Sequence, residues 1–265
     1  MISQIVTHGP IWTRLALVQD HLDLLGDDAG GRAVYDQLGP REQAEYARYT
    51  HPARRRVWRL GRIMCRELLR EAAGDTLDAV ASIEILSRDD HDDHVRPTVF
   101  LRGEQEPQLA THLNSLPLSI AHFNDAVCVA LSTDPQLGVG VDLVEATELG
   151  DGFQQTWFSP DERQLVAEGD SSTAVTLWAV KEAVYKAVNN GEQFRPKEIE
   201  VQRDATGRYR CSVRGHQWGE RCTIDVHHRG AQIIVLATAQ LDPPRPASRD
   251  DSFTNRTPAL ATTAE

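Results

Sequence analysis

The sequence lacks the patterns that mark secreted, zinc-stabilised or membrane-inserted proteins. Its four cysteines form no CxxC pair: Cys65, Cys128, Cys211 and Cys222. Scattered cysteines suggest neither a zinc site nor a disulfide framework, and they fit a reducing cytoplasm best. No apolar run approaches the length that crosses a bilayer, and the first residues lack the basic stretch and apolar run of a leader. We therefore expect a cytoplasmic protein that is neither secreted nor inserted in a membrane.

A surplus of positive charge is also missing. The chain has 28 Lys and Arg against 39 Asp and Glu, a formal net charge of -11. Nucleic-acid binders gain much of their affinity by neutralising phosphates, so this balance argues against a general nucleic-acid partner. An anionic ligand must therefore meet a local basic patch, and the arginines do cluster between Arg54 and Arg70.

The chain is long enough to bury a core in one or two domains, and the segment STDPQLG contains the turn-forming residues of a junction. We expect an N-terminal half at 1–135, a C-terminal half at 136–241, and a disordered tail at 242–265, which is rich in Pro, Ser, Thr and Ala. Periodicity predicts strands and helices in both halves. The strands are expected at 11–18, 81–86, 118–122, 126–131, 138–145, 198–202, 209–213, 222–227 and 232–239, and the helices at 53–74 and 172–188 and from Pro40 and Pro160. The charged run 87–97 is expected to be an exposed loop.

The segment GVGVDLVE predicts a strand with two different faces. Val139, Val141 and Leu143 share one face, so Asp142 lies on the other, beside residues small enough to approach a backbone or a ligand. Taken alone, Asp142 is most simply a strand-end aspartate that caps a turn.

The helix WAVKEAVYKAV carries an apolar stripe that leaves Glu182 and Lys186 on another side, four residues apart. Alone, such a pair is most often a solvated surface pair that contributes roughly 0.2–0.5 kcal/mol. Together with Asp142, however, the two carboxylates could hold Mg²⁺, which takes one or two protein carboxylates and leaves other positions to water and substrate phosphate. The combination predicts a site for a pyrophosphate substrate.

These residues resemble the signature of the phosphopantetheinyl transferases, a G-x-D strand followed some forty residues later by W-x-x-K-E-x-x-x-K. The chain has Gly140-Val141-Asp142 and then Trp178, Lys181, Glu182 and Lys186, in that order. Between them, FSPDERQ is similar to the family's F-(S/T)-x-x-E segment. The resemblance implies an α+β fold: a monomeric pseudo-dimer of two similar α/β halves, each a small antiparallel sheet packed against helices, with the active site at their interface.

The resemblance also implies coenzyme A contacts. Candidates are Arg55 and Arg56 near a helix start, Arg96 in a segment similar to G-K-P, His122 in a segment similar to S-H-S-G, and Lys181. From the residues alone, the arginines of the 53–74 helix more often form a solvated face bridged to acids, and a lone histidine is more often structural.

The second acid of the family's D-x-E pattern is replaced by Val144 here. Strand alternation turns Glu145 to the face opposite Asp142 unless a bulge intervenes. The D-L-V-E segment is similar to holo-acyl-carrier-protein synthases and to transferases that fill this position with water. We therefore expect two protein metal ligands, Asp142 and Glu182.

The implied activity is transfer of 4'-phosphopantetheine from coenzyme A to a serine of an acyl or peptidyl carrier protein, with release of 3',5'-ADP and Mg²⁺ as cofactor. Glu182 would accept the serine proton and Lys186 would stabilise the pyrophosphate. Phe153, Trp157 and Phe158 could dock the carrier protein, although we expect at least two of them in the core. Two alternatives remain: a non-catalytic coenzyme A or carrier-protein binding protein, and a metal-binding protein that uses the Asp89–His94 loop.

Overall fold

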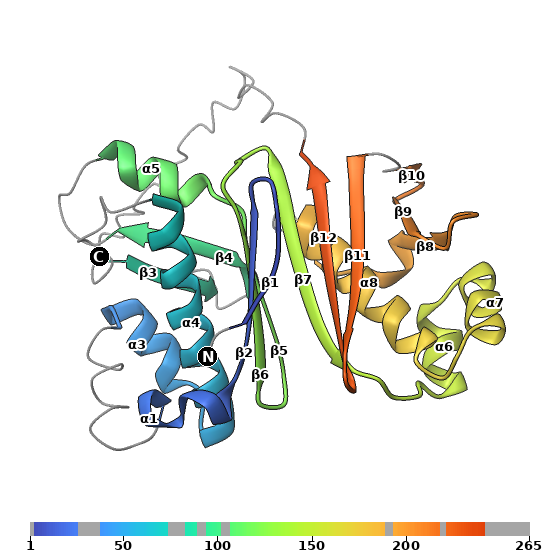
Figure 1. Cartoon of the computed structure of the whole chain (residues 1–265), viewed down its shortest axis with the longest axis horizontal. Coiled ribbons are helices and arrows are strands. Elements are labelled where there is room, and N and C mark those ends of the chain that lie inside the picture. The colour runs from blue at the N-terminus through green and yellow to red at the C-terminus, as the bar shows by residue number, and fades with distance from the viewer. Residues whose placement is uncertain are drawn as a thin grey trace, which may run out of the picture.

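Two antiparallel sheets pack face to face, and each carries a long helix on its outer face (Figure 1). The computed structural model describes residues 3–25, 38–73, 83–88, 94–101, 107–188, 193–217 and 221–241. The first sheet has the order β1 (Ser3–His8), β2 (Ile11–Leu17), β6 (Ala126–Ser132), β5 (Leu118–Phe123). The second has the order β11 (Cys222–Arg229), β12 (Gln232–Gln240), β7 (Leu137–Glu145). The long helices are α4 (Pro52–Ala73) and α8 (Thr173–Val188).

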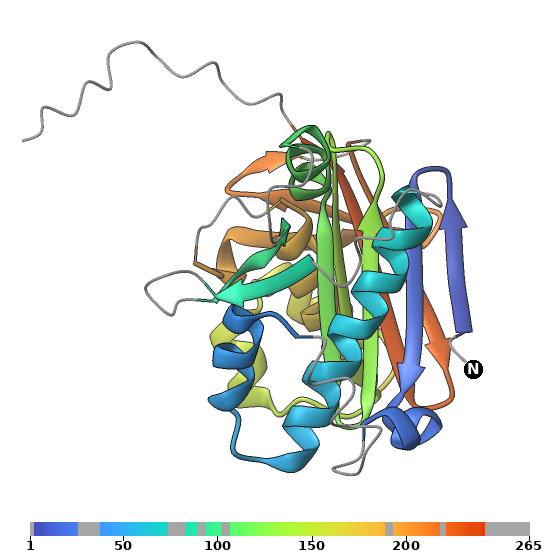
Figure 2. The same ribbon diagram turned by 90° about the vertical axis from the view of Figure 1, so that its left-hand side faces the viewer.

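Three apolar layers hold these elements together. One lies between α4 and the first sheet, a second between the two sheets, and a third between α8 and the second sheet. Figure 2 shows α4 running along the face of the first sheet. Strand β7 serves two of these layers, because its odd residues Val139, Val141 and Leu143 face the first sheet while Val144 packs with α8. Asp142 therefore points to the α8 side, as the alternation predicted.

The remaining elements extend each half. In the first half they are η1 (Val18–His21), α1 (Leu22–Leu25), α3 (Pro40–Ala47), β3 (Ile83–Arg88), β4 (His94–Leu101) and α5 (Pro107–Ser115). In the second half they are α6 (Asp151–Trp157), α7 (Pro160–Glu168), η4 (Pro196–Glu198), β8 (Ile199–Arg203), β9 (Tyr209–Val213) and β10 (His216–Gln217). Strands β3 and β4 pair with each other, and β10, β9 and β8 form a small sheet.

The two halves repeat one plan, so the fold is a pseudo-dimer. The order strand, short helix, long helix, hairpin, hairpin runs as β2, α3, α4, β3–β4, β5–β6 and again as β7, α7, α8, β8–β9, β11–β12. The short helices begin alike, with a proline in the first turn and a glutamate that accepts a hydrogen bond from the N-cap amide, Gly39 to Glu42 and Ser159 to Glu162. In α7 the Ser159 hydroxyl also accepts from the Glu162 amide, which completes a capping box. Their glutamates also act alike: Glu42 accepts a hydrogen bond from the Ile85 amide in β3, and Glu162 accepts one from the Val201 amide in β8.

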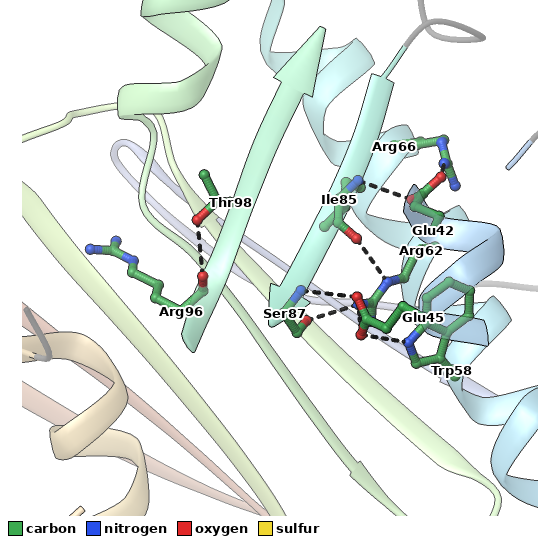
Figure 3. A network of polar contacts seen from close by, with 9 residues as sticks. All are labelled: Glu42, Glu45, Trp58, Arg62, Arg66, Ile85, Ser87, Arg96 and Thr98. Atoms are coloured by element: carbon green, nitrogen blue, oxygen red, sulfur yellow. Dashed lines mark hydrogen bonds and ion pairs between the residues drawn. The ribbon is translucent and has the colours of Figure 1, made fainter. Parts of the chain in front are cut away.

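Three of the seven arginines of α4 are buried: Arg59, Arg62 and Arg66. Arg62 pairs with Glu45 at 3.0 Å and also donates to the Ile85 carbonyl and the Ser87 hydroxyl (Figure 3). Arg66 pairs with Glu42, whose side chain is fully buried. Arg62 and Arg66 therefore bridge to acids as expected, but they are buried against α3 and β3 and are not solvated.

Most predicted elements occur within a few residues of their expected ends, with two kinds of difference. The expected loop at 87–97 is shorter, because β3 continues to Arg88 and β4 begins at His94, which places Arg96 in a strand. The short helices α1, α5 and α6 and the strands β1, β4 and β10 were not predicted. Residues 89–93 and the tail 242–265 lie outside the described residues. In the part of the chain that the structure describes, no helix is both long and apolar enough to span a bilayer.

Candidate active site

The site begins with a close approach between β7 and α8. A Cβ atom on Gly140 would lie 1.9 Å from the Ala183 carbonyl oxygen and 2.5 Å from the Ala187 amide nitrogen. One on Gly138 would lie 2.2 Å from the Ala187 carbonyl oxygen. No other residue type leaves room for the helix backbone at these two positions. The glycines therefore let the backbone of α8 lie directly against β7 just before Asp142 in the strand.

This contact brings Asp142 together with Lys186 and Glu182. The Lys186 Nζ donates to Asp142 Oδ1 at 2.7 Å and to the Val141 carbonyl at 3.1 Å. It lies 3.6 Å from Glu182 Oε2. The Asp142 side chain is 8% exposed, whereas that of Glu182 is 30% exposed and that of Lys186 is 26% exposed. The strand and the helix thus place two carboxylates on either side of one ammonium, at the edge of solvent.

The charges of the three groups are coupled. Burial raises the pKa of Glu182, and the nearby negative charge of Asp142 raises it further, against the opposing effect of Lys186. Burial lowers the pKa of Lys186, but the carboxylates of Asp142 and then Glu182 outweigh it, so the pKa of Lys186 is raised overall. Lys186 is therefore a persistent cation, and it does not fully neutralise the two acids. The excess negative charge is the feature that a divalent cation would satisfy.

Lys181 lies elsewhere, although it precedes Glu182 in the chain. Its side chain is 1% exposed and pairs with Glu162 at 2.8 Å. It also donates to the carbonyl oxygens of Pro196 at 3.0 Å and Ile199 at 2.5 Å. Burial lowers the pKa of Lys181, an effect that Glu162 opposes. This is a structural ion pair that fastens α8 to α7 and β8, the reverse of the placement expected for a phosphate ligand.

The expected coenzyme A contacts of the first half lie on α4, β4 and β5. The Arg96 side chain points away from the Glu42 and Glu45 network (Figure 3). Burial lowers the pKa of Arg96, and its buried Nη2 has no hydrogen-bond partner among the described residues. The Nε of Arg56 is also buried without such a partner in the described structure. A partly desolvated guanidinium with a donor to spare is well suited to an anionic ligand.

Arg55 and His122 are placed differently from Arg96. Arg55 donates to the Tyr49 carbonyl at 2.5 Å and lies over the Tyr46 ring, so its guanidinium is engaged locally. His122 lies on β5, which contacts α4, β4 and β7. Strand β5 also reaches the site directly, because the Ser119 hydroxyl accepts a hydrogen bond from the Val141 amide at 3.0 Å. The sequence offered no signal for this contribution of Ser119.

The remaining candidates separate into core and surface. Phe158 is 3% exposed, and Phe153 and Trp157 pack against the same core cluster, so the expectation of core for at least two of them is met. Glu145 is exposed, and Asn124 donates to it at 3.5 Å. The described residues contain no group of three or more His, Cys, Asp and Glu side chains arranged to hold a metal. The two expected metal ligands, Asp142 and Glu182, form a pair of carboxylates on either side of Lys186.

Comparison with known proteins places this geometry in context. The family described as the 4'-phosphopantetheinyl transferase superfamily matches residues 138–239, which contain Asp142, Glu182 and Lys186. A holo-[acyl-carrier-protein] synthase from Mycoplasma mobile is 30% identical over 102 residues, with 37% of this chain and 84% of that protein covered. One from Mycoplasmoides gallisepticum is 26% identical over 117 residues, with 39% of this chain and 96% of that protein covered.

The solved structures that resemble this chain are also holo-acyl-carrier-protein synthases, and their TM-scores are low. A holo-(acyl-carrier-protein) synthase of Bacillus anthracis in complex with CoA is 21% identical, covers 40% of this chain and 96% of its own, and has a TM-score of 0.33. That of Helicobacter pylori in complex with coenzyme A is 16% identical, covers 37% of this chain and 96% of its own, and has a TM-score of 0.31. The sequence matches define the chain as a transferase. It belongs to the 4'-phosphopantetheinyl transferase superfamily.

Proposed function

We propose that the protein transfers 4'-phosphopantetheine from coenzyme A to a serine of an acyl or peptidyl carrier protein and releases 3',5'-ADP. The observation that carries the proposal is the group formed by Asp142, Glu182 and Lys186, where β7 meets α8 inside the family match. Two acids and a persistent cation at the edge of solvent suit a reaction in which phosphoryl charge must be positioned and stabilised.

Asp142 and Glu182 would hold Mg²⁺. The fit rests on the donor set: the two carboxylates lie on either side of a single ammonium, with Lys186 Nζ 2.7 Å from Asp142 and 3.6 Å from Glu182. The group is short of positive charge, and two carboxylates are the number that Mg²⁺ accepts from a protein that binds it together with substrate phosphate. When bound, Mg²⁺ would neutralise charge on the coenzyme A pyrophosphate and act as a Lewis acid.

The protein groups have separate parts in the transfer. The serine oxygen attacks the β-phosphorus of coenzyme A, and the bond from that phosphorus to the oxygen of the departing 3',5'-ADP breaks. Glu182 accepts the serine proton, since a carboxylate with a raised pKa is a better base at neutral pH. Lys186 stabilises the developing charge on the pyrophosphate. We favour this electrostatic part over proton donation, because the raised pKa of Lys186 makes it a poor acid.

The two halves would divide the substrates. We propose that residues 1–135 contact coenzyme A, chiefly through Arg96 with its spare Nη2 donor, and with help from Arg55, Arg56 and His122. Residues 136–241 would hold the metal and dock an acidic carrier protein. Because the site draws on both halves of one chain, a monomer suffices for it.

Substitution of the two acids tests the proposal. Purified Asp142→Ala and Glu182→Ala variants are incubated with coenzyme A, Mg²⁺ and an apo carrier protein, and the carrier is weighed by mass spectrometry. We expect the wild type to add one phosphopantetheine and both variants to lose at least two orders of magnitude in rate, the usual scale for groups that stabilise a transition state.

Glu145→Ala is the matched control. It removes a carboxylate from the same strand, but from an exposed position on the opposite face, and should leave the rate unchanged. Normal transfer by the Asp142 or Glu182 variants would exclude the proposed site. A wild type that binds coenzyme A yet modifies no carrier protein would indicate a binding protein instead.

A further inference from the structure

Because the two halves repeat one plan, each residue of the candidate active site has a matching position in the first half. Arg14 in β2 lies opposite the fourth residue of β6, and Asp142 in β7 lies opposite the fourth residue of β12. Four residues farther on, the N–H groups of Val18 and Ala146 donate to the carbonyls just before β6 and β12, at 2.7 and 2.6 Å. The strand position of Asp142 is therefore held by Arg14 in the first half.

The long helices α4 and α8 match through Arg66 and Lys181. Each of these side chains pairs with the first-turn glutamate of the preceding short helix, Arg66 with Glu42 and Lys181 with Glu162. Each also donates to the carbonyl of the first residue of the next hairpin, in β3 and in β8. The residues that follow Arg66 and Lys181 on the two helices therefore match as well.

The three matching positions of the first half form an ion-pair cluster. Arg14 stands at the position of the strand acid, Glu67 at that of the helix acid, and Glu71 at that of the helix lysine. The Arg14 Nη1 donates to Glu67 Oε2 at 2.7 Å, and its Nη2 donates to Glu71. In the first half the strand thus supplies the cation and the helix supplies both acids, so the charge is inverted at two of the three positions.

The spacing of strand and helix differs in the same sense. Trp12 stands at the position of Gly140 and packs into the core layer under α4. A tryptophan cannot allow the backbone contact that glycine allows, and α4 lies against β6 rather than β2, whereas α8 lies on β7. The long side chain of Arg14 spans the wider gap, and its planar fork can engage two carboxylates at once.

Both clusters contain two acids and one base, but they use the base differently. The fork of Arg14 reaches Glu67 and Glu71 together. The Lys186 ammonium, in contrast, lies 3.6 Å from Glu182 and leaves that carboxylate weakly paired. The acids of the first half are therefore engaged by the protein itself, and one acid of the second half remains open to another cation.

We propose that Arg14 is a resident cation that closes a second metal site, with its guanidinium held by Glu67 and Glu71 where the second half offers Asp142 and Glu182 to a divalent ion. The first half then binds no divalent cation, and one metal ion binds per chain. The inference rests on the proposed function in one respect, since it takes Asp142 and Glu182 as the metal ligands of the second half.

The test is Arg14→Asp in the full-length protein, with the number of bound Mn²⁺ ions measured by calorimetric titration. The substitution removes the guanidinium and adds a third carboxylate beside Glu67 and Glu71, and carboxylates suit Mn²⁺. We expect the wild type to bind one Mn²⁺ and Arg14→Asp to bind two, the second more weakly because Trp12 keeps strand and helix apart. Where Arg14→Asp does not fold, Arg14→Asn supplies a neutral oxygen ligand and should also bind two.

Three controls place the added ion. Arg70→Asp makes the same change of charge at an exposed position of α4 but keeps the guanidinium, and should bind one Mn²⁺. In the Arg14→Asp background, Glu67→Gln should remove the added ion, whereas Asp142→Ala should remove the original ion and leave the added one.

Two Mn²⁺ ions in the wild type, or a single ion in a folded Arg14→Asp or Arg14→Asn variant, would overturn the inference. A second ion in Arg70→Asp would also overturn it, because the gain would then need no loss of the guanidinium. Wild-type Mn²⁺ binding that survives Asp142→Ala would instead overturn the metal site of the proposed function, and the ion added by Arg14→Asp would still decide the first half.

Discussion

Replacing Gly140 by alanine tests the contact on which the whole site depends. The added Cβ would lie 1.9 Å from the Ala183 carbonyl oxygen and 2.5 Å from the Ala187 amide nitrogen, both backbone atoms that no rotamer change can move. Ordinary contact needs about 3.4 Å or more, so α8 must retreat from β7 by about 1 Å or more. The helix is locked by its own buried stripe, so this retreat disturbs the core cluster between α8 and the second sheet.

The sign of the effect follows from two magnitudes. Replacing glycine with alanine removes unfolded-state entropy and can stabilise a protein by about 0.4–1 kcal/mol. Overpacking a well-filled core costs about 1–3 kcal/mol, and here the colliding atoms are backbone, so the cost wins. We expect Gly140→Ala to lower the melting temperature by several degrees, at about 2–4 °C per kcal/mol for a chain of this size.

Activity should fall further than stability does. The retreat of α8 moves Lys186 and Glu182 away from Asp142, and a displacement of about 1 Å at reacting groups can cost on the order of 100-fold in rate. The assays are thermal melting by circular dichroism and transfer to an apo carrier protein at a temperature where the variant is folded. Gly152→Ala is the control, because a Cβ at this position of α6 meets nothing within 4 Å and should leave stability equal or slightly higher. Wild-type stability and rate in Gly140→Ala would refute the argument from close approach.

Three other substitutions are expected to separate stability from activity. Lys181→Met leaves Glu162 buried without its cation and should destabilise by about 3–5 kcal/mol in denaturant melts, while the Michaelis constant for coenzyme A stays unchanged. Glu182→Gln should raise the melting temperature at pH 7 with chelator present. Because the pKa of Glu182 is raised in the folded protein, ionisation of its carboxyl group costs folding stability as the pH rises. The stability gained by the Gln variant should therefore vanish as the pH falls and Glu182 of the wild type becomes protonated. Arg96→Met should weaken coenzyme A binding by about 10–100-fold without loss of stability, because its Nη2 is buried without a partner among the described residues, and an unchanged dissociation constant would remove Arg96 from the site.

The sequence allowed Asp142 and Glu182 to be chosen because each lies on a regular element with a clear period. Alternation along β7 separates Asp142 from Val141 and Leu143, and the apolar stripe of α8 leaves Glu182 and Lys186 on another side. The helix starts at Pro40 and Pro160 are equally local, since each needs only the residues within one turn. These features depend on neighbours a few positions away, and the structure shows them where they were predicted.

Only the tertiary structure decided which charged side chains face inward. Lys181, Arg62 and Arg66 look available in the sequence, but they are internal because α7 and α3 bring glutamates against them: Glu162, Glu45 and Glu42. Trp178 likewise packs against rings that are distant in the chain, Phe153 from α6 and Phe194 from beyond α8. The periodicity of apolar residues identifies which face of a helix or strand a side chain lies on, but the residues that pack against that face come from distant parts of the chain. The sequence therefore determined Asp142, Glu182 and Lys186 as candidates for the site, and the fold decided that Lys181 pairs with Glu162 instead of joining them.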